Sequence, residues 1–240
     1  MSFIEKTHRR GFLGRLVGAA AALGVTSGGS HAEAAQPAAA PSPDDWIKGV
    51  KGTHRCLFDF PQHKNGMPLL HIANYLGTYS AAYKSAPGTV AAVGTFYSMG
   101  PQSSIPLAFN DAMWKKYALG DYLGLKDAAG KPYTRNVFNK PTADDLHLMM
   151  AAIQSPTIPA FAGAMPGIGL ESLQKMGTTF LLCENAFGGW CAELEARKKG
   201  KAADLQAELR ANLLPGVIVV PAMVIAIERA QAAGIRYNRQ

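Results

Sequence analysis

Hydrophobic positions along the chain fall into short continuous runs separated by stretches with helical spacing. The run Thr89–Phe96 is nearly all apolar. Such runs predict β-strands buried on both faces, as in a parallel sheet. The predicted strands are His54–Phe60, Thr89–Phe96, Thr178–Cys183, Val217–Val220 and an edge strand over Ile235–Asn238.

Apolar residues at helical spacing fill most of the gaps between these runs. The predicted helices are Leu69–Tyr83, Gly169–Met176, Ala186–Lys199 with a kink at Gly188-Gly189, Asp204–Leu213 and Pro221–Ala233. Strands that alternate with helices predict an α/β fold: a three-layer parallel sheet with helices on both faces, flavodoxin-like or Rossmann-like. No glycine-rich dinucleotide or triphosphate motif follows a strand, so a nucleotide site is not indicated.

The segment 97–168 is less regular and too long for an ordinary connection. A helix is expected to begin near Pro106, followed by a loop over Gly124–Lys140. Thr142 and Asp145 have the spacing of a capping box at the start of a further helix. We therefore expect a helical insertion in the middle of the domain, serving as a lid or an interface.

The first 34 residues have the order of an export signal. Arg9 and Arg10 precede a short apolar core, and Ala32-Glu33-Ala34 forms an A-x-A cleavage site. Twin arginines before a mildly hydrophobic core indicate the twin-arginine route, with the Tat translocase as the export partner. Cleavage near Ala34 would leave a flexible leader over 35–48 and a domain over 49–240 in the periplasm, without a membrane segment.

Composition limits the other classes of function. At 48% hydrophobic and 17% charged residues, the chain can build a sizeable core. The signal holds four basic and two acidic residues, so its removal lowers the net charge from +7 to +5. The one dense basic cluster, 197–201, has acidic neighbours and is typical of a solvated helix end. Neither the charge nor any motif indicates a nucleic-acid partner.

The chain has three cysteines, an odd number that does not form a disulfide framework. Cys183 ends a predicted strand where the next helix begins, the place where parallel α/β sheets hold their sites. Its thiolate would be stabilised by the helix N-terminus, although a buried, inert cysteine fits the position too. Cys191 could be a resolving thiol or a packed helix residue, and Cys56 is expected in the core.

Other polar candidates are fewer. Asn74, Glu184 and Asn185 are possible binding residues beside the predicted helix starts or faces, or simple surface groups. Three histidines gather near the first strand, but no HxxxH, HExxH or CxxC spacing is present. No metal ligand set is therefore predicted, and no G-x-S-x-G elbow indicates a serine nucleophile.

Four segments together resemble the DsrE-like family of sulfur-relay proteins and leave the middle of the chain uncovered. They are His71–Leu76 with the strand before it, Thr89–Val93, Phe180–Phe187, and Pro215–Ala222 running on to Tyr237. The resemblance implies a small parallel α/β domain, a homo-oligomer (trimer or hexamer) and no organic cofactor. It also implies a persulfide on Cys183 that is passed to a partner, although the well-understood relay members work in the cytoplasm.

Three hypotheses follow. The chain is a sulfur carrier or thiol-active protein centred on Cys183, whose enzymatic activity would be sulfur transfer. Alternatively, it is a non-enzymatic periplasmic binding or scaffold subunit with the same fold. A third alternative is a metal-binding accessory protein that uses the histidines near the first strand.

Overall fold

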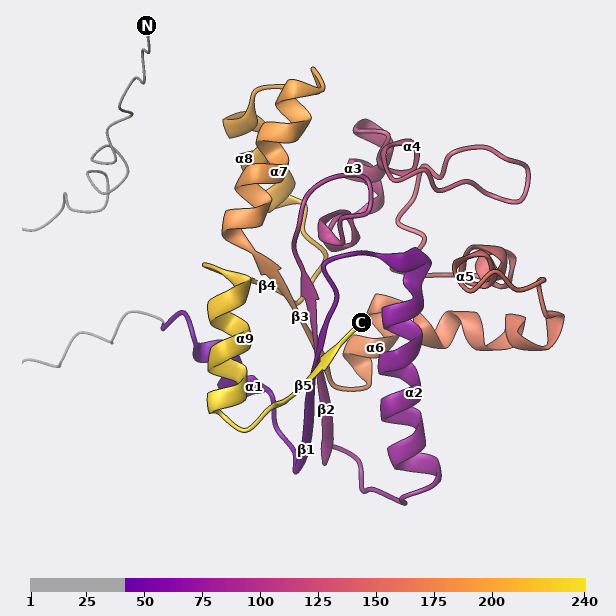
Figure 1. The fold of residues 1–240 in the computed structure, drawn as a ribbon, viewed down its shortest axis with the longest axis vertical. Helices are drawn as coiled ribbons and strands as arrows, with labels where there is room; N and C mark the ends of the chain where they lie inside the picture. The colour runs from indigo at the N-terminus through magenta and orange to yellow at the C-terminus, as the bar shows by residue number, and fades with distance from the viewer. Residues whose placement is uncertain (1–41) are drawn as a thin grey trace, which may run out of the picture. The chain divides into compact units, whose positions relative to one another are not determined.

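A five-stranded, all-parallel sheet forms the centre of the computed structural model, which describes residues 42–240 (Figure 1). The predicted α/β class is therefore confirmed. The strands are β1 His54–Asp59, β2 Val90–Phe96, β3 Thr178–Cys183, β4 Val217–Val220 and β5 Arg236–Arg239.

The strand order is β4-β3-β2-β1-β5, so the chain moves in one direction from β1 to β4 and then crosses back to β5. This reversal between β1 and β5 is a topological switch point, next to which doubly wound sheets bind their ligands. In the register, Phe96 lies opposite Leu182, and Cys183 lies opposite Val220. The carboxyl ends of all five strands therefore meet along one edge.

Helices cover both faces of the sheet and interleave with the strands (Figure 1). The α-helices are α1 Asp45–Gly49, α2 Met67–Ala81, α3 Asp111–Lys116, α4 Leu119–Tyr122, α5 Leu146–Ala152, α6 Leu170–Lys175, α7 Glu184–Ala196, α8 Ala202–Ala211 and α9 Met223–Ala232. Short 3₁₀ segments are η1 Lys64–Gly66, η2 Ile105–Ala108, η3 Ala143–Asp145 and η4 Pro159–Ile168. No helix within residues 42–240 is long and apolar enough to span a membrane.

Each face of the sheet has its own hydrophobic core because successive strand residues point to opposite sides. Phe180 and Leu182 of β3 belong to the larger core, which contains side chains of α2, α6, α7 and α8. Leu181 and Cys183 belong to the smaller core, which contains side chains of α1 and α9. We call these the large-core face and the small-core face.

The helical segment between β2 and β3 is confirmed, and it is part of the main core. Apolar side chains of η2, α3 and α4, among them Trp114, are buried in the large core, as is Phe109 directly after η2. The indole N–H of Trp114 donates to the carbonyl oxygen of Pro106 at 2.9 Å. The first part of the segment, from η2 to α4, is therefore a built-in layer of the domain.

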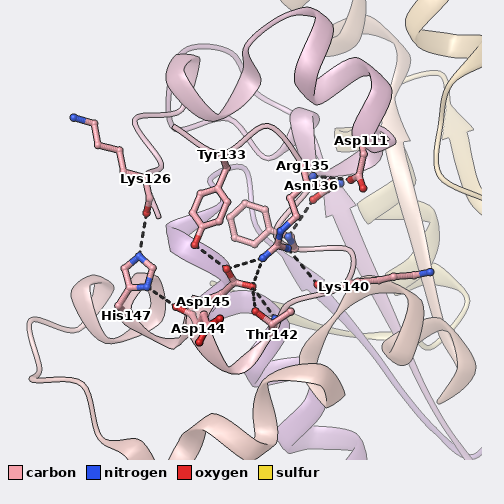
Figure 2. A network of polar contacts seen from close by, with 11 residues as sticks. Asp111, Lys126, Tyr133, Arg135, Asn136, Lys140, Thr142, Asp144, Asp145 and His147 are labelled. Atoms are coloured by element: carbon pink, nitrogen blue, oxygen red, sulfur yellow. Dashed lines mark hydrogen bonds and ion pairs between the residues drawn. The ribbon is translucent and has the colours of Figure 1, made fainter. Parts of the chain in front are cut away.

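An ion pair between the buried Asp145 and the partly exposed Arg135 organises the outer part of this segment (Figure 2). Arg135 donates to both carboxylate oxygens of Asp145, at 2.8 and 2.6 Å, and the Tyr133 hydroxyl donates at 2.7 Å. The backbone N–H of Thr142 donates to the same carboxylate, as the capping-box spacing predicts, and the Thr142 hydroxyl donates to it as well. Burial acts to raise the pKa of Asp145, but these hydrogen bonds outweigh it and the pKa lies below its usual value.

Three local expectations were wrong. Residues 45–48, assigned to the flexible leader, belong to α1, because the Trp46 side chain is buried in the small core. The helix expected from Pro106 is broken into η2, α3 and α4. Helix α7 passes through Gly188-Gly189 without a kink. The signal peptide and cleavage site lie outside the described residues.

Candidate functional site

Cys183 lies at the carboxyl end of β3 and is the N-cap residue of α7. Its sulfur accepts a hydrogen bond from the backbone N–H of Ala186, in the first turn of α7, at 3.4 Å. It also accepts one from the backbone N–H of Met223, the first residue of α9, at 3.2 Å. One sulfur atom thus caps two helices, and both positive helix ends are directed at it.

The surroundings of Cys183 are largely apolar. Its side chain is only 5% exposed and packs in the small core with Val220 and Met223. Tyr97, one residue beyond the Phe96–Leu182 pair, packs against the same core. Cys183 as a whole is therefore largely shielded from solvent.

Glu184 and Asn185 stand beside Cys183, but their side chains do not contact it. The Glu184 carboxylate forms an ion pair with Arg210 of α8 and accepts a hydrogen bond from the Gln206 amide at 2.7 Å. Asn185 is exposed, and its backbone N–H donates to the carbonyl oxygen of Pro221 at 3.3 Å. Glu184 therefore ties α7 to α8, whereas the Asn185 side chain remains available at the rim.

Cys191 is placed away from Cys183. It is fully buried in the large core, on the opposite side of the sheet. Burial, with a smaller contribution from the charge of Glu184, raises the pKa of its thiol to about 12. Eight residues of α-helix separate the two α-carbons by about 12 Å, beyond the roughly 7 Å limit for a disulfide. A resolving role would therefore require the helix to unwind.

Asn74 also lies away from Cys183, on α2 and on the large-core face. Its side-chain oxygen accepts a hydrogen bond from the Thr78 hydroxyl at 3.2 Å. The residue is exposed and lines an open groove together with His71 and Tyr75. The structure therefore separates the predicted site residues: Cys183, Glu184 and Asn185 share one edge, and Cys191 and Asn74 do not join them.

A second polar cluster at the carboxyl edge was not singled out from the sequence as a site. Asp59, at the end of β1, is buried and accepts hydrogen bonds from the hydroxyls of Tyr97 at 2.8 Å and Tyr237 at 2.7 Å. The Thr95 hydroxyl lies 3.3 Å from the same carboxylate. Burial and the bond to Asp59 raise the pKa of Tyr97. The cluster sits at the β1–β5 switch point and shares Tyr97 with the surroundings of Cys183.

The histidines near the first strand do not converge. His63 is buried, while His54 stacks on Tyr79 with ring centroids 4.5 Å apart. Within residues 42–240, no group of three or more histidine, cysteine, aspartate or glutamate side chains is placed to hold a metal ion. The metal-binding hypothesis therefore has no ligand cluster to rest on in this part of the chain.

Comparison of the chain with protein-family models, with curated proteins and with solved structures finds no match.

Proposed function

We propose that the protein is an exported, DsrE-like sulfur carrier that holds sulfane sulfur on Cys183. The observation that carries the proposal is the sulfur atom at the carboxyl edge of the sheet, with N–H groups of Ala186 and Met223 directed at it. Helix N-termini favour negative charge, so they would stabilise a thiolate or a persulfide anion at this point.

The proposed step needs only a sulfur donor. The Cys183 thiolate attacks the outer sulfur of thiosulfate, and a new S–S bond forms as the S–S bond of thiosulfate breaks. Sulfite leaves with the bonding electron pair, and Cys183 is left as a persulfide anion. A second thiolate on an acceptor can then attack the outer sulfur and release the Cys183 thiolate.

A scaffold or binding subunit is the second candidate, and the 5% exposure of Cys183 favours it. In that case the sulfur acts only as a cap for α7 and α9. The two candidate functions predict opposite reactivities of the Cys183 thiol in the folded protein.

Intact-mass spectrometry before and after incubation with thiosulfate separates the two. The carrier gains one sulfur atom, the gain reverses with dithiothreitol, and Cys183→Ser abolishes it while Cys191→Ser does not. If the mass stays unchanged and Cys183 reacts with iodoacetamide only after unfolding, the scaffold role stands instead. Mapping the mature N-terminus of protein from a periplasmic extract tests the export signal in the same preparation.

A further inference from the structure

A groove of about 610 Å³ lies between α2 and the end of β5, on the large-core face. One wall is formed by Tyr75, Tyr79 and Tyr83, which follow one another at four-residue spacing. The opposite wall contains Asn238 and Gln240. Since Cys183 faces the other side of the sheet, this groove is separate from the proposed sulfur site.

The tyrosine rings form a continuous ladder. Ring centroids of Tyr75 and Tyr79 are 5.0 Å apart, and those of Tyr79 and Tyr83 are 5.3 Å apart. Behind the ladder, His54 stacks on Tyr79 and Phe58 packs edge-on against Tyr75, which fixes both rings. At the outer end, Tyr83 is 71% exposed, so its ring is free to contact a ligand.

Hydrogen-bond donors are left over on both walls. The Asn238 side-chain oxygen accepts from Gln240, and the Asn74 oxygen accepts from Thr78, so both amide groups keep their N–H donors for a ligand. No hydrogen bond joins the three tyrosine hydroxyls to another residue within 42–240. Of the residues that line the groove, none has a carboxylate side chain. The groove therefore offers ring faces and donors, and suits a ligand rich in acceptors.

We propose that this groove binds a proline-rich segment of a partner protein in the polyproline II conformation. Such a segment presents carbonyl acceptors, its prolines lack N–H groups, and proline rings pack on aromatic side chains. The two ladder steps span at most about 10 Å, and one polyproline II turn of three residues spans about 9 Å. Prolines at positions i and i+3 would therefore reach both ends of the ladder.

Two other ligand classes use aromatic platforms. Single-stranded nucleic acid needs a positively charged track for its phosphates, and Arg239 is the one lysine or arginine among the lining residues. Sugar rings also stack on tyrosine, but they bring donors of their own to a groove that already has donors in excess. Both ligand classes are therefore included as alternative ligands in the test.

The test is an NMR titration of the full ¹⁵N-labelled chain with the peptide acetyl-Gly-Pro-Pro-Ala-Pro-Pro-Gly-amide. We expect a Kd below about 1 mM, with shifts at the side-chain amides of Asn74 and Asn238. The same peptide with alanine in place of every proline should bind at least about tenfold more weakly, because it is not preorganised.

Matched variants locate the binding. Tyr83→Ala should weaken binding about tenfold, while Phe161→Ala, which removes a ring that is 51% exposed outside the groove, should leave it unchanged. Cys183→Ser should also leave it unchanged. Equal binding of both peptides, equal binding to the Tyr83→Ala variant, or shifts at these amides with cellotriose or hexathymidylate but not with the peptide would overturn the proposal.

Discussion

The titration of the buried His63 side chain makes the free energy of unfolding of the domain depend on pH. The imidazole is 1% exposed, and its Nδ1 accepts a hydrogen bond from the backbone N–H of Asn65 at 3.1 Å. Nε2 lies 3.3 Å from the carbonyl oxygen of Pro101, so the neutral tautomer with a proton on Nε2 satisfies both contacts. A second proton, on Nδ1, would face the Asn65 N–H and place a charge in the core. Burial accordingly lowers the pKa of His63 to about 4, while the bond to Pro101 acts in the opposite direction.

The direction of this pH dependence follows from the linkage between proton binding and folding. The folded pKa lies below the ordinary value of 6.5, so between these two values the unfolded state binds more protons. Stability therefore falls as the pH drops from about 7 towards 4. Between pH 7 and pH 5, this one group should remove about 2 kcal/mol from the free energy of unfolding, and at most about 3 kcal/mol at lower pH.

Urea unfolding at pH 7 and pH 5 measures the effect, with His63→Asn as the comparison. The asparagine oxygen can accept the Asn65 N–H as Nδ1 does, but it does not titrate. We expect the loss of stability between the two pH values to be about 2 kcal/mol smaller in the variant. Equal losses in the two proteins would refute the reasoning, because other titrating groups would then account for the whole pH dependence.

Three further predictions concern stability. The free energy of unfolding of Cys183→Ser should stay within about 1 kcal/mol of the wild type, because the serine hydroxyl can accept both N–H groups. Cys183→Ala should lose about 1–3 kcal/mol. Equal losses for the two variants in urea unfolding would show that the sulfur is not a cap. Asp145→Ala should cost about 1–3 kcal/mol because it leaves the Tyr133 hydroxyl and the Thr142 N–H without their acceptor, whereas the partly exposed Arg135 can be solvated, and a calorimetric loss under 1 kcal/mol would contradict this. Gly120→Ala should lower the thermal midpoint, because its Cβ would lie 2.1 Å from the carbonyl oxygen of Tyr133; an unchanged midpoint would show that the backbone gives way without cost.

The central fold could be predicted because its signals are local. Continuous apolar runs give β2 and β3 their burial on both faces, and the alternation with helices determines the α/β class. The α1 helix was missed because only Trp46, Ile47 and the following Val50 anchor it in the core, in a segment otherwise rich in proline and charge. The broken helices after Pro106 follow from tertiary packing, which the local spacing does not contain.

The candidate site was predicted only in part, for a similar reason. The place of Cys183 follows from a strand that ends where a helix begins, and that signal is local. Its second hydrogen-bond donor, Met223, lies 40 residues away and is brought in by the strand order. In the second cluster, Tyr97 and Tyr237 lie 38 and 178 residues from Asp59. Searching for polar residues in the last two positions of every predicted strand and just after it would have found Asp59 and Tyr97.

Because a single sulfur atom caps both α7 and α9, a chemical modification of Cys183 affects the N-termini of both helices. An added sulfur or oxygen atom moves the acceptor by a bond length and changes its charge, so the first turns of two helices must readjust together. These helices follow the neighbouring strands β3 and β4 and flank opposite faces of the sheet. Oxidation of the Cys183 sulfur would therefore be detectable as fraying of the first turns of α7 and α9.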